Sequence, residues 1–144
     1  HLLDRGIGRG TLVALLIPRS AELMVAIWAV AKTGAGYVPI DPDYPADRVS
    51  HMITDSGARL GLTLGDVAGP GMPGSEWLEL DATELIEAVA AASDSPVTDA
   101  DRPSAVGADD TALEDVVFRQ GLLDALPKGE PPKTPGKIVK ATVA

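Results

Sequence analysis

Residues 11–34 carry a hydrophobic pattern that changes from a continuous run to a helical one. Thr11–Ile17 (TLVALLI) is apolar almost throughout and lies between a glycine and a proline, as expected of a strand buried on both faces. Ser20 suits a helix N-cap and Gly34 suits the residue that ends a helix. We therefore predict a parallel-sheet strand followed by a helix over residues 21–33.

This first helix is apolar on nearly every side. One sheet cannot cover all of its apolar positions, so we expect a neighbour on its other side. The residues that create this pattern are Leu23, Met24, Val25, Ile27, Trp28 and Val30.

The next stretch predicts two more strands around a second helix. Residues 37–40 form a short strand, and the following Asp-Pro-Asp-Tyr-Pro turn places Pro45 at the first helical position. The helix is predicted to end near Ser56, and residues 58–64 alternate like a half-buried strand. The apolar side chains expected on the inner face of this helix are Val49, Met52 and Ile53.

A fourth strand and a third helix follow a loop rich in glycine and proline. Residues 76–80 predict the strand, and Asp81 with Glu84 forms a capping-box pattern for a helix over residues 82–92. The inner face of this helix is predicted to hold Leu85, Ile86 and Val89. The element order predicts the α/β class, with a three-layer parallel-sheet subdomain and an extended or helical C-terminal tail.

The chain divides into three regions by composition. Residues 1–92 hold the predicted α/β elements, and residues 93–110 form an exposed connector rich in Pro, Asp and Ser. In residues 111–144 a helix to about Leu126, capped by Thr111 and Glu114, precedes a basic, proline-rich tail.

Composition is typical of a soluble globular protein, with 45% hydrophobic and 23% charged residues. The chain has no cysteine, which excludes disulfides and thiolate chemistry and fits a reducing cytoplasm. No apolar run reaches the length of a membrane helix. Because the HLLDRG start has the pattern of a helix interior, we expect the natural protein to continue upstream.

The net charge of −9 is concentrated in the middle of the sequence. Residues 65–115 hold thirteen acidic and one basic side chain, whereas residues 116–144 hold two acidic and five basic. An acidic centre without a Lys/Arg stripe argues against nucleic-acid binding. A solvated acidic surface is the preferred interpretation.

The segment Ala31–Arg48 reads AKTGAGYVPIDPDYPADR. It resembles the second core signature of amino-acid-adenylating domains of nonribosomal peptide synthetases, and the residues before it and after it follow the same family through Ala112. The resemblance implies an N-terminal adenylation-domain region. It also implies a parent enzyme that activates an amino acid with ATP and magnesium and loads a carrier-protein thiol.

Beyond Ala112 the sequence departs from this family. Adenylation domains have there a Ser/Thr/Gly-rich loop that holds the ATP phosphates, but this chain reads LEDVVFRQGLL. Bulky aliphatic and acidic residues do not let backbone amides converge on an anion. We therefore expect no cofactor site in this chain and no activity of the chain alone, and an internal deletion or mistaken join near Ala112 is the simplest hypothesis.

The final stretch, LPKGEPPKTPGKIVK, resembles the last core signature of the family. By this resemblance Lys137 corresponds to the catalytic lysine that reaches the α-phosphate and the carboxylate. Pro135 and Lys140 depart from the usual residues of the signature. A lysine in a solvated basic tail is the alternative interpretation.

Two further function classes stay open. One is a non-catalytic interaction module that docks onto other synthetase domains or a carrier protein through the apolar first helix. The other is a fragment of a related acyl-CoA ligase, since that superfamily shares the terminal Gly-Lys signature.

The remaining motifs favour structural interpretations. The RGIGRG glycines Gly6, Gly8 and Gly10 precede a strand, so a turn is favoured over a dinucleotide loop. Asp41 and Asp43 are expected to form a rigid turn and not a metal site.

The aromatic, histidine and serine residues are also assigned structural positions. Trp28 and Trp77 are predicted to be core aromatics, and His51 is expected on a helix surface. Ser20 and Ser56 are expected to serve as caps at helix ends.

Overall fold

The computed structural model describes residues 1–67, 76–107 and 110. Its elements are η1 (Leu3–Arg5), β1 (Leu12–Leu16), α1 (Ala21–Thr33), β2 (Gly36–Ile40), α2 (Ala46–Ser56), β3 (Leu60–Thr63), β4 (Glu76–Glu79) and α3 (Thr83–Ala90). The four strands form one sheet of order β2-β1-β3-β4 in which every neighbouring pair is parallel. The predicted α/β class and parallel sheet are confirmed.

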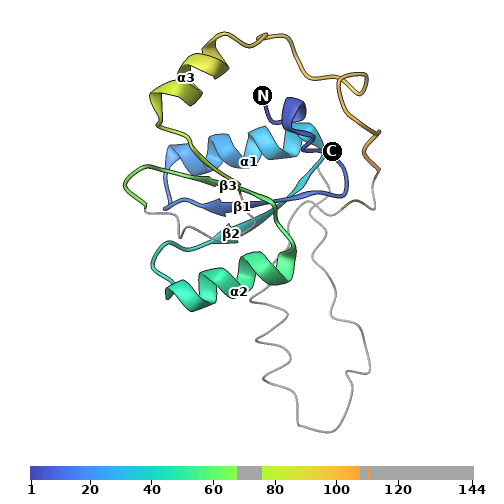
Figure 1. Cartoon of the computed structure of the whole chain (residues 1–144). Helices are drawn as coiled ribbons and strands as arrows, with labels where there is room; N and C mark the ends of the chain where they lie inside the picture. The colour runs from blue at the N-terminus through green and yellow to red at the C-terminus, as the bar shows by residue number, and fades with distance from the viewer. Residues whose placement is uncertain (68–75, 108–109, 111–144) are drawn as a thin grey trace, which may run out of the picture.

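The sheet lies between helices on its two faces (Figure 1), with α1 on one side and α2 on the other. Alternate residues of β1 supply both interiors, because side chains along a strand point to opposite faces. Val13 and Leu15 pack with the inner face of α1, and Ala14 and Leu16 pack with α2. The central strand is therefore buried on both faces, as its uninterrupted apolar sequence predicts.

The first helix has the predicted boundaries. Ser20 is extended and its side chain accepts a hydrogen bond from the Leu23 N–H, and Gly34 ends the helix with a left-handed φ of 81°. A side chain at Gly34 would also collide with Val106, so both conformation and space favour glycine.

The second helix and third strand differ in detail from the prediction. Pro45 is the N-cap of α2 and not its first helical residue, which leaves its fixed φ just outside the helix. Val49, Met52 and Ile53 are buried as predicted. All four residues of β3 are buried. Leu60 and Leu62 lie in the core on the α1 side, and the Trp77 ring covers Gly61 on the other face.

The capping box predicted for the third helix is wrong. Ala82 is the N-cap of α3 and makes no side-chain capping bond. The Asp81 carboxylate instead accepts a hydrogen bond from the Gly65 N–H at 2.8 Å. Asp81 thus bonds Gly65, which is distant in sequence, and does not cap the helix that follows it.

The apolar faces predicted to be inside are partly on the surface. No residue of α3 is buried, and Ile86 and Val89 are exposed. Trp28, predicted to be a core aromatic, is 58% exposed on α1. Nothing in the described part of the chain covers these outer helix faces. Among the described helices, none is long and apolar enough to cross a membrane.

Trp77 lies over Gly61, its register partner on β3. A Cβ at Gly61 would fall inside the van der Waals radius of the indole ring. The ring thus uses the space left by the missing side chain and packs against the α2 side of the core. The position of β4 depends on this close approach.

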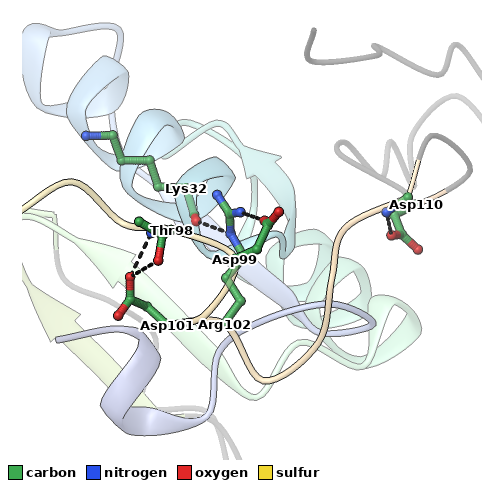
Figure 2. Close-up of polar contacts among 7 residues, drawn as sticks. Lys32, Thr98, Asp99, Asp101, Arg102 and Asp110 are labelled. Atoms are coloured by element: carbon green, nitrogen blue, oxygen red, sulfur yellow. Dashed lines mark hydrogen bonds and ion pairs between the residues drawn. The ribbon is translucent and has the colours of Figure 1, made fainter.

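The segment after α3 returns to the amino edge of the sheet, where the parallel strands begin (Figure 2). The Arg102 guanidinium donates to the Lys32 carbonyl at 2.9 Å and pairs with Asp99. Both the N–H and the hydroxyl of Thr98 donate to Asp101, each at 2.7 Å. We call these five residues the amino-edge clasp.

The amino-edge clasp satisfies a carbonyl in the last turn of α1, where helix carbonyls lack intrahelical partners. Residues 93–107 are largely exposed, and this contact anchors them to the last turn of α1. The division into regions 1–92, 93–110 and 111–144 stays a prediction. The helix and tail expected in the third region lie outside the described residues.

We expect Gly61→Ala to reduce the free energy of unfolding by about 1–3 kcal/mol, because the added methyl collides with Trp77. Urea denaturation followed by circular dichroism measures the change. Gly107→Ala is the control, since its new Cβ makes only an ordinary contact and should change stability by less than about 0.5 kcal/mol. Equal stability of the Gly61→Ala protein and the parent would contradict the close approach.

A second prediction concerns acid. The Thr98 hydroxyl and then its N–H hold the pKa of Asp101 below the ordinary value. The stability contributed by ionised Asp101 is therefore full above the pKa of the unfolded chain, and is lost as pH falls through the lower folded pKa.

Melting temperatures measured from about pH 7 to about pH 2 should decline less steeply on acidification for Asp101→Asn than for the parent. The control is Asp94→Asn, at an exposed position where the described part of the chain shows no side-chain partner. The melting temperature of Asp94→Asn should fall with pH as steeply as that of the parent. Identical profiles for the two variants would remove the assigned role of Asp101.

Candidate functional site

The sheet topology marks one place where a ligand could bind. The chain moves from β1 to β2 through α1, and then from β2 to β3 through α2, so its strand order reverses direction beside β1. Open α/β sheets bind ligands outside the carboxyl ends of the strands at such a switch point. The candidate site is therefore the carboxyl edge between the ends of β1 and β3.

Thr63 closes this switch point from inside. Its side chain is buried, and its hydroxyl oxygen lies 3.1 Å from the Leu16 carbonyl oxygen and 3.2 Å from that of Val67. The hydroxyl thus connects the end of β1 with the turn after β3, where the Val67 N–H donates to the Leu64 carbonyl at 2.9 Å. The Thr63 hydroxyl therefore makes a polar contact between the two strand ends.

The N-terminus of α1 stands at the same edge. The pKa of Glu22 lies below its ordinary value because its own backbone N–H and then the Ser20 hydroxyl donate to the carboxylate, while the charge of Asp81 opposes the shift. The Glu22 carboxylate is therefore a negative charge near the positive, N-terminal end of the α1 dipole.

The Ala31–Arg48 segment forms the end of α1, then β2, a turn and the start of α2. In the turn, the Asp41 carboxylate accepts from the Asp43 N–H at 3.0 Å, and the Asp41 carbonyl accepts from the Tyr44 N–H at 3.1 Å. The Arg48 guanidinium lies 4.2 Å from the centre of the Tyr44 ring, a cation–π contact. The rigid turn predicted for this segment is confirmed, and its polar groups serve the fold.

Metal binding finds no support in the described residues. Within residues 1–67, 76–107 and 110, no three His, Asp or Glu side chains are grouped so that they could hold an ion. His51 is exposed on α2 as expected, and His1 accepts a hydrogen bond from the Arg5 guanidinium at the other end of the fold. The two histidines are not brought together.

The other singled-out residues have structural positions. The segment with Gly6, Gly8 and Gly10 forms a turn before β1, in which the Thr11 N–H donates to the Gly8 carbonyl at 3.0 Å. The Ser56 hydroxyl donates to a carbonyl in the last turn of α2.

Lys137, the predicted catalytic residue, lies outside the described residues. Its role stays a prediction.

The sequence did not single out Thr63 and Glu22, which make polar interactions at this edge. Thr63 is a polar residue at the end of an otherwise apolar strand, which is a usable signal for a polar contact at a strand terminus. Glu22 follows the Ser20 cap by two residues, a spacing that favours an acid beside the helix N-terminus.

Residues 1–138 match the family model described as AMP-binding enzyme. The match covers both the described part and most of the C-terminal region. It agrees with the resemblance found in the Ala31–Arg48 segment.

Two relatives show the extent of the sequence similarity. Novobiocin biosynthesis protein H of Streptomyces niveus is 36% identical over 130 residues, which cover 89% of this chain and 21% of the relative. Malpibaldin synthetase of Mortierella alpina is 42% identical over 87 residues, which cover 60% of this chain and 2% of that protein. The chain therefore spans a small part of the length of these relatives.

The fold agrees with the sequence comparison. A crystal structure of the nonribosomal peptide synthetase FmoA3, in its α-methyl-L-serine-AMP bound form, superposes with a TM-score of 0.65 and 29% sequence identity. The match covers 78% of this chain and 12% of that one. This chain therefore belongs to the AMP-binding enzyme family and is similar in sequence and fold to its nonribosomal peptide synthetase members.

Proposed function

We propose that this chain is a scaffold section of an amino-acid-adenylating enzyme of nonribosomal peptide synthesis, and that it does not form an aminoacyl adenylate by itself. The family membership supports the first half of this proposal. The second half depends on the character of the carboxyl edge.

The observation that carries the proposal is the closed switch point between β1 and β3. A nucleotide site at this edge requires an open crevice and free backbone N–H groups at a helix N-terminus. Here Thr63 bridges the strand ends. Glu22 and Ser20 use donors at the start of α1. These contacts support an edge whose polar groups serve the fold in place of a phosphate.

The Asp41 and Asp81 carboxylates each accept a hydrogen bond from a backbone N–H. In our proposal these two carboxylates hold the fold in place and do not serve a nucleotide-bound magnesium ion. The phosphates need a concave ring of small residues, and the turn after β1 offers Pro18, Arg19 and Ser20. We assign no step of adenylation to these residues.

By the family resemblance, the whole parent enzyme joins the carboxylate of an amino acid to the α-phosphate of ATP and releases pyrophosphate. In the scaffold role, this chain supports the structure of the enzyme and supplies none of the groups that react. Its sheet would hold neighbouring parts of a larger synthetase in place, which agrees with the small share of its relatives that it covers. Other synthetase domains are the partners that this role requires.

The purified 144-residue chain should show no amino-acid-dependent exchange of pyrophosphate into ATP, because the sequence after Ala112 reads LEDVVFRQGLL where the family has a small-residue loop for the phosphates. Radiolabelled pyrophosphate incorporation, measured with each of the proteinogenic amino acids, checks this. Lys137→Ala should give the same background reading. A purified enzyme with known amino-acid-adenylating activity serves as the positive control.

Thermal unfolding with and without ATP and magnesium gives an independent reading. A ligand present at 100 times its Kd would add about 2.7 kcal/mol to the free energy of unfolding, and we expect no such shift. Exchange that requires an amino acid and is lost in Lys137→Ala would disprove the scaffold proposal and would give Lys137 the catalytic role that the sequence predicts.

A further inference from the structure

Helix α1 leaves one side without a partner in the described part of the chain. Its inward residues, Ala26 and Val30, pack against the sheet. Met24, Val25 and Trp28 are 53%, 66% and 58% exposed, and their spacing along the helix places them together on the opposite side. We call these three residues the outer face of α1. An exposed cluster of large apolar side chains is typical of a surface that binds a partner.

Charges of both signs lie at the start of α1, and a basic residue lies at its end. At the start, Arg19 is exposed just before the helix, and the charge of Asp81 acts on the Glu22 carboxylate. At the end, Lys32 is exposed, and Figure 2 shows its ammonium group pointing away from the acidic side chains of the amino-edge clasp. Among the described residues, neither Arg19 nor Lys32 forms an ion pair.

The end of α1 also has negative charge beside it. Arg102 pairs with Asp99, so these two charges compensate each other. Hydrogen bonds from Thr98 keep the pKa of Asp101 low, so this carboxylate is ionised near neutral pH. Both ends of α1 therefore present both signs. A partner of a single charge sign would meet like charges at both ends, which disfavours a purely basic or purely acidic occupant.

A second copy of α1, laid antiparallel across the outer face, presents these charges in the reverse order. The helix spans Ala21–Thr33, so Glu22 and Lys32 lie five residues on either side of its midpoint. They are also within about a quarter of a turn of each other around the helix axis. A two-fold axis at the midpoint places each Glu22 opposite the Lys32 of the other copy, because an isologous interface pairs residue i with j and j with i.

The same arrangement suits the other charges near the helix. Arg19 of one copy comes beside the carboxyl end of the other copy's α1, where the helix dipole is negative and Asp101 is ionised. Helix α3, which carries the exposed Glu84 and Glu87, lies near the start of α1 (Figure 1). The two-fold axis therefore puts the two α3 helices at opposite ends of the pair, where their acidic side chains stay apart.

We propose that the outer face of α1 binds the same face of a second copy of this chain. The two α1 helices run antiparallel around a two-fold axis near their midpoints, and Glu22 of each copy pairs with Lys32 of the other. Met24, Val25 and Trp28 form the apolar centre of the interface, which agrees with the preference of interface cores for aromatic residues and methionine. This self-association goes beyond the scaffold role and is independent of nucleotide binding.

Two charge-reversed variants of the full chain test the pairing. Glu22→Lys and Lys32→Glu should each weaken self-association at least about tenfold, because like charges then meet at both ends of the pair. An equimolar mixture of the two variants should associate as tightly as the parent, because the reversed charges are complementary across a mixed dimer. Sedimentation velocity over a series of protein concentrations measures the three dissociation constants.

The matched control uses two exposed residues away from the outer face of α1. Asp55→Lys, on α2, and Arg59→Glu, just before β3, change the net charge by the same amounts as the test pair. Helix α2 covers the opposite face of the sheet (Figure 1). Each control variant, and their mixture, should associate as tightly as the parent.

A third variant tests the apolar centre. Trp28→Ala should weaken association at least about tenfold, because tryptophans at the centre of an interface contribute strongly to binding. Its melting temperature, measured at a concentration where the parent is monomeric, should stay close to that of the parent, since the side chain is 58% exposed. Association of Trp28→Ala as tight as that of the parent would contradict the proposal.

Two other results would overturn it. A parent chain that stays monomeric at every concentration would leave the outer face of α1 to another synthetase domain. A mixture of Glu22→Lys and Lys32→Glu that associates no more tightly than either variant alone would exclude the antiparallel pairing, once circular dichroism shows that both variants are folded. None of these measurements depends on pyrophosphate exchange, so self-association and the scaffold proposal can fail separately.

Discussion

The structure depends on the burial of β1 on both of its faces. Val13 and Leu15 contact one helix layer, and Ala14 and Leu16 contact the other. The same strand is hydrogen-bonded to β2 on one side and to β3 on the other. Since burial of apolar surface is the dominant favourable term in folding, this strand holds two cores together. The helices α1 and α2 pack on its two faces, and the strands β2 and β3 lie beside it.

At the amino edge and at the carboxyl edge of the sheet, a side chain forms a hydrogen bond to a backbone carbonyl. At the amino edge, Arg102 satisfies the Lys32 carbonyl of α1. At the carboxyl edge, Thr63 contacts the Leu16 and Val67 carbonyls. In both cases a side chain completes backbone hydrogen bonding where an element ends. The carboxyl edge of such sheets is often a ligand site in other proteins, and in the described residues the Thr63 hydroxyl makes polar contacts there.

The outer surfaces of α1 and α3 carry the remaining functional information. Their apolar side chains point away from the sheet, and charged residues surround them. Trp28, Met24 and Val25 are exposed together on one side of α1, a feature typical of surfaces that bind a partner. The relatives that share its sequence include proteins many times longer than this chain.

The sequence by itself determined the local elements and the family. The strand at 12–16 and the helix from Ser20 to Gly34 were predictable because burial periodicity and caps are local properties. The Ala31–Arg48 segment identified the family for the same reason, since its turn is built from neighbouring residues. Lys137, in contrast, stays a prediction from sequence.

Only the tertiary structure decided which apolar and polar groups found partners. Trp28 has the composition of a core residue but lies outside, because periodicity does not reveal whether a second layer exists to cover a helix. Asp81 has the pattern of a cap but binds the Gly65 N–H, and Thr63 closes the edge of the sheet through Leu16. These contacts join residues far apart in the sequence, and the folding of the sheet is what brings them together.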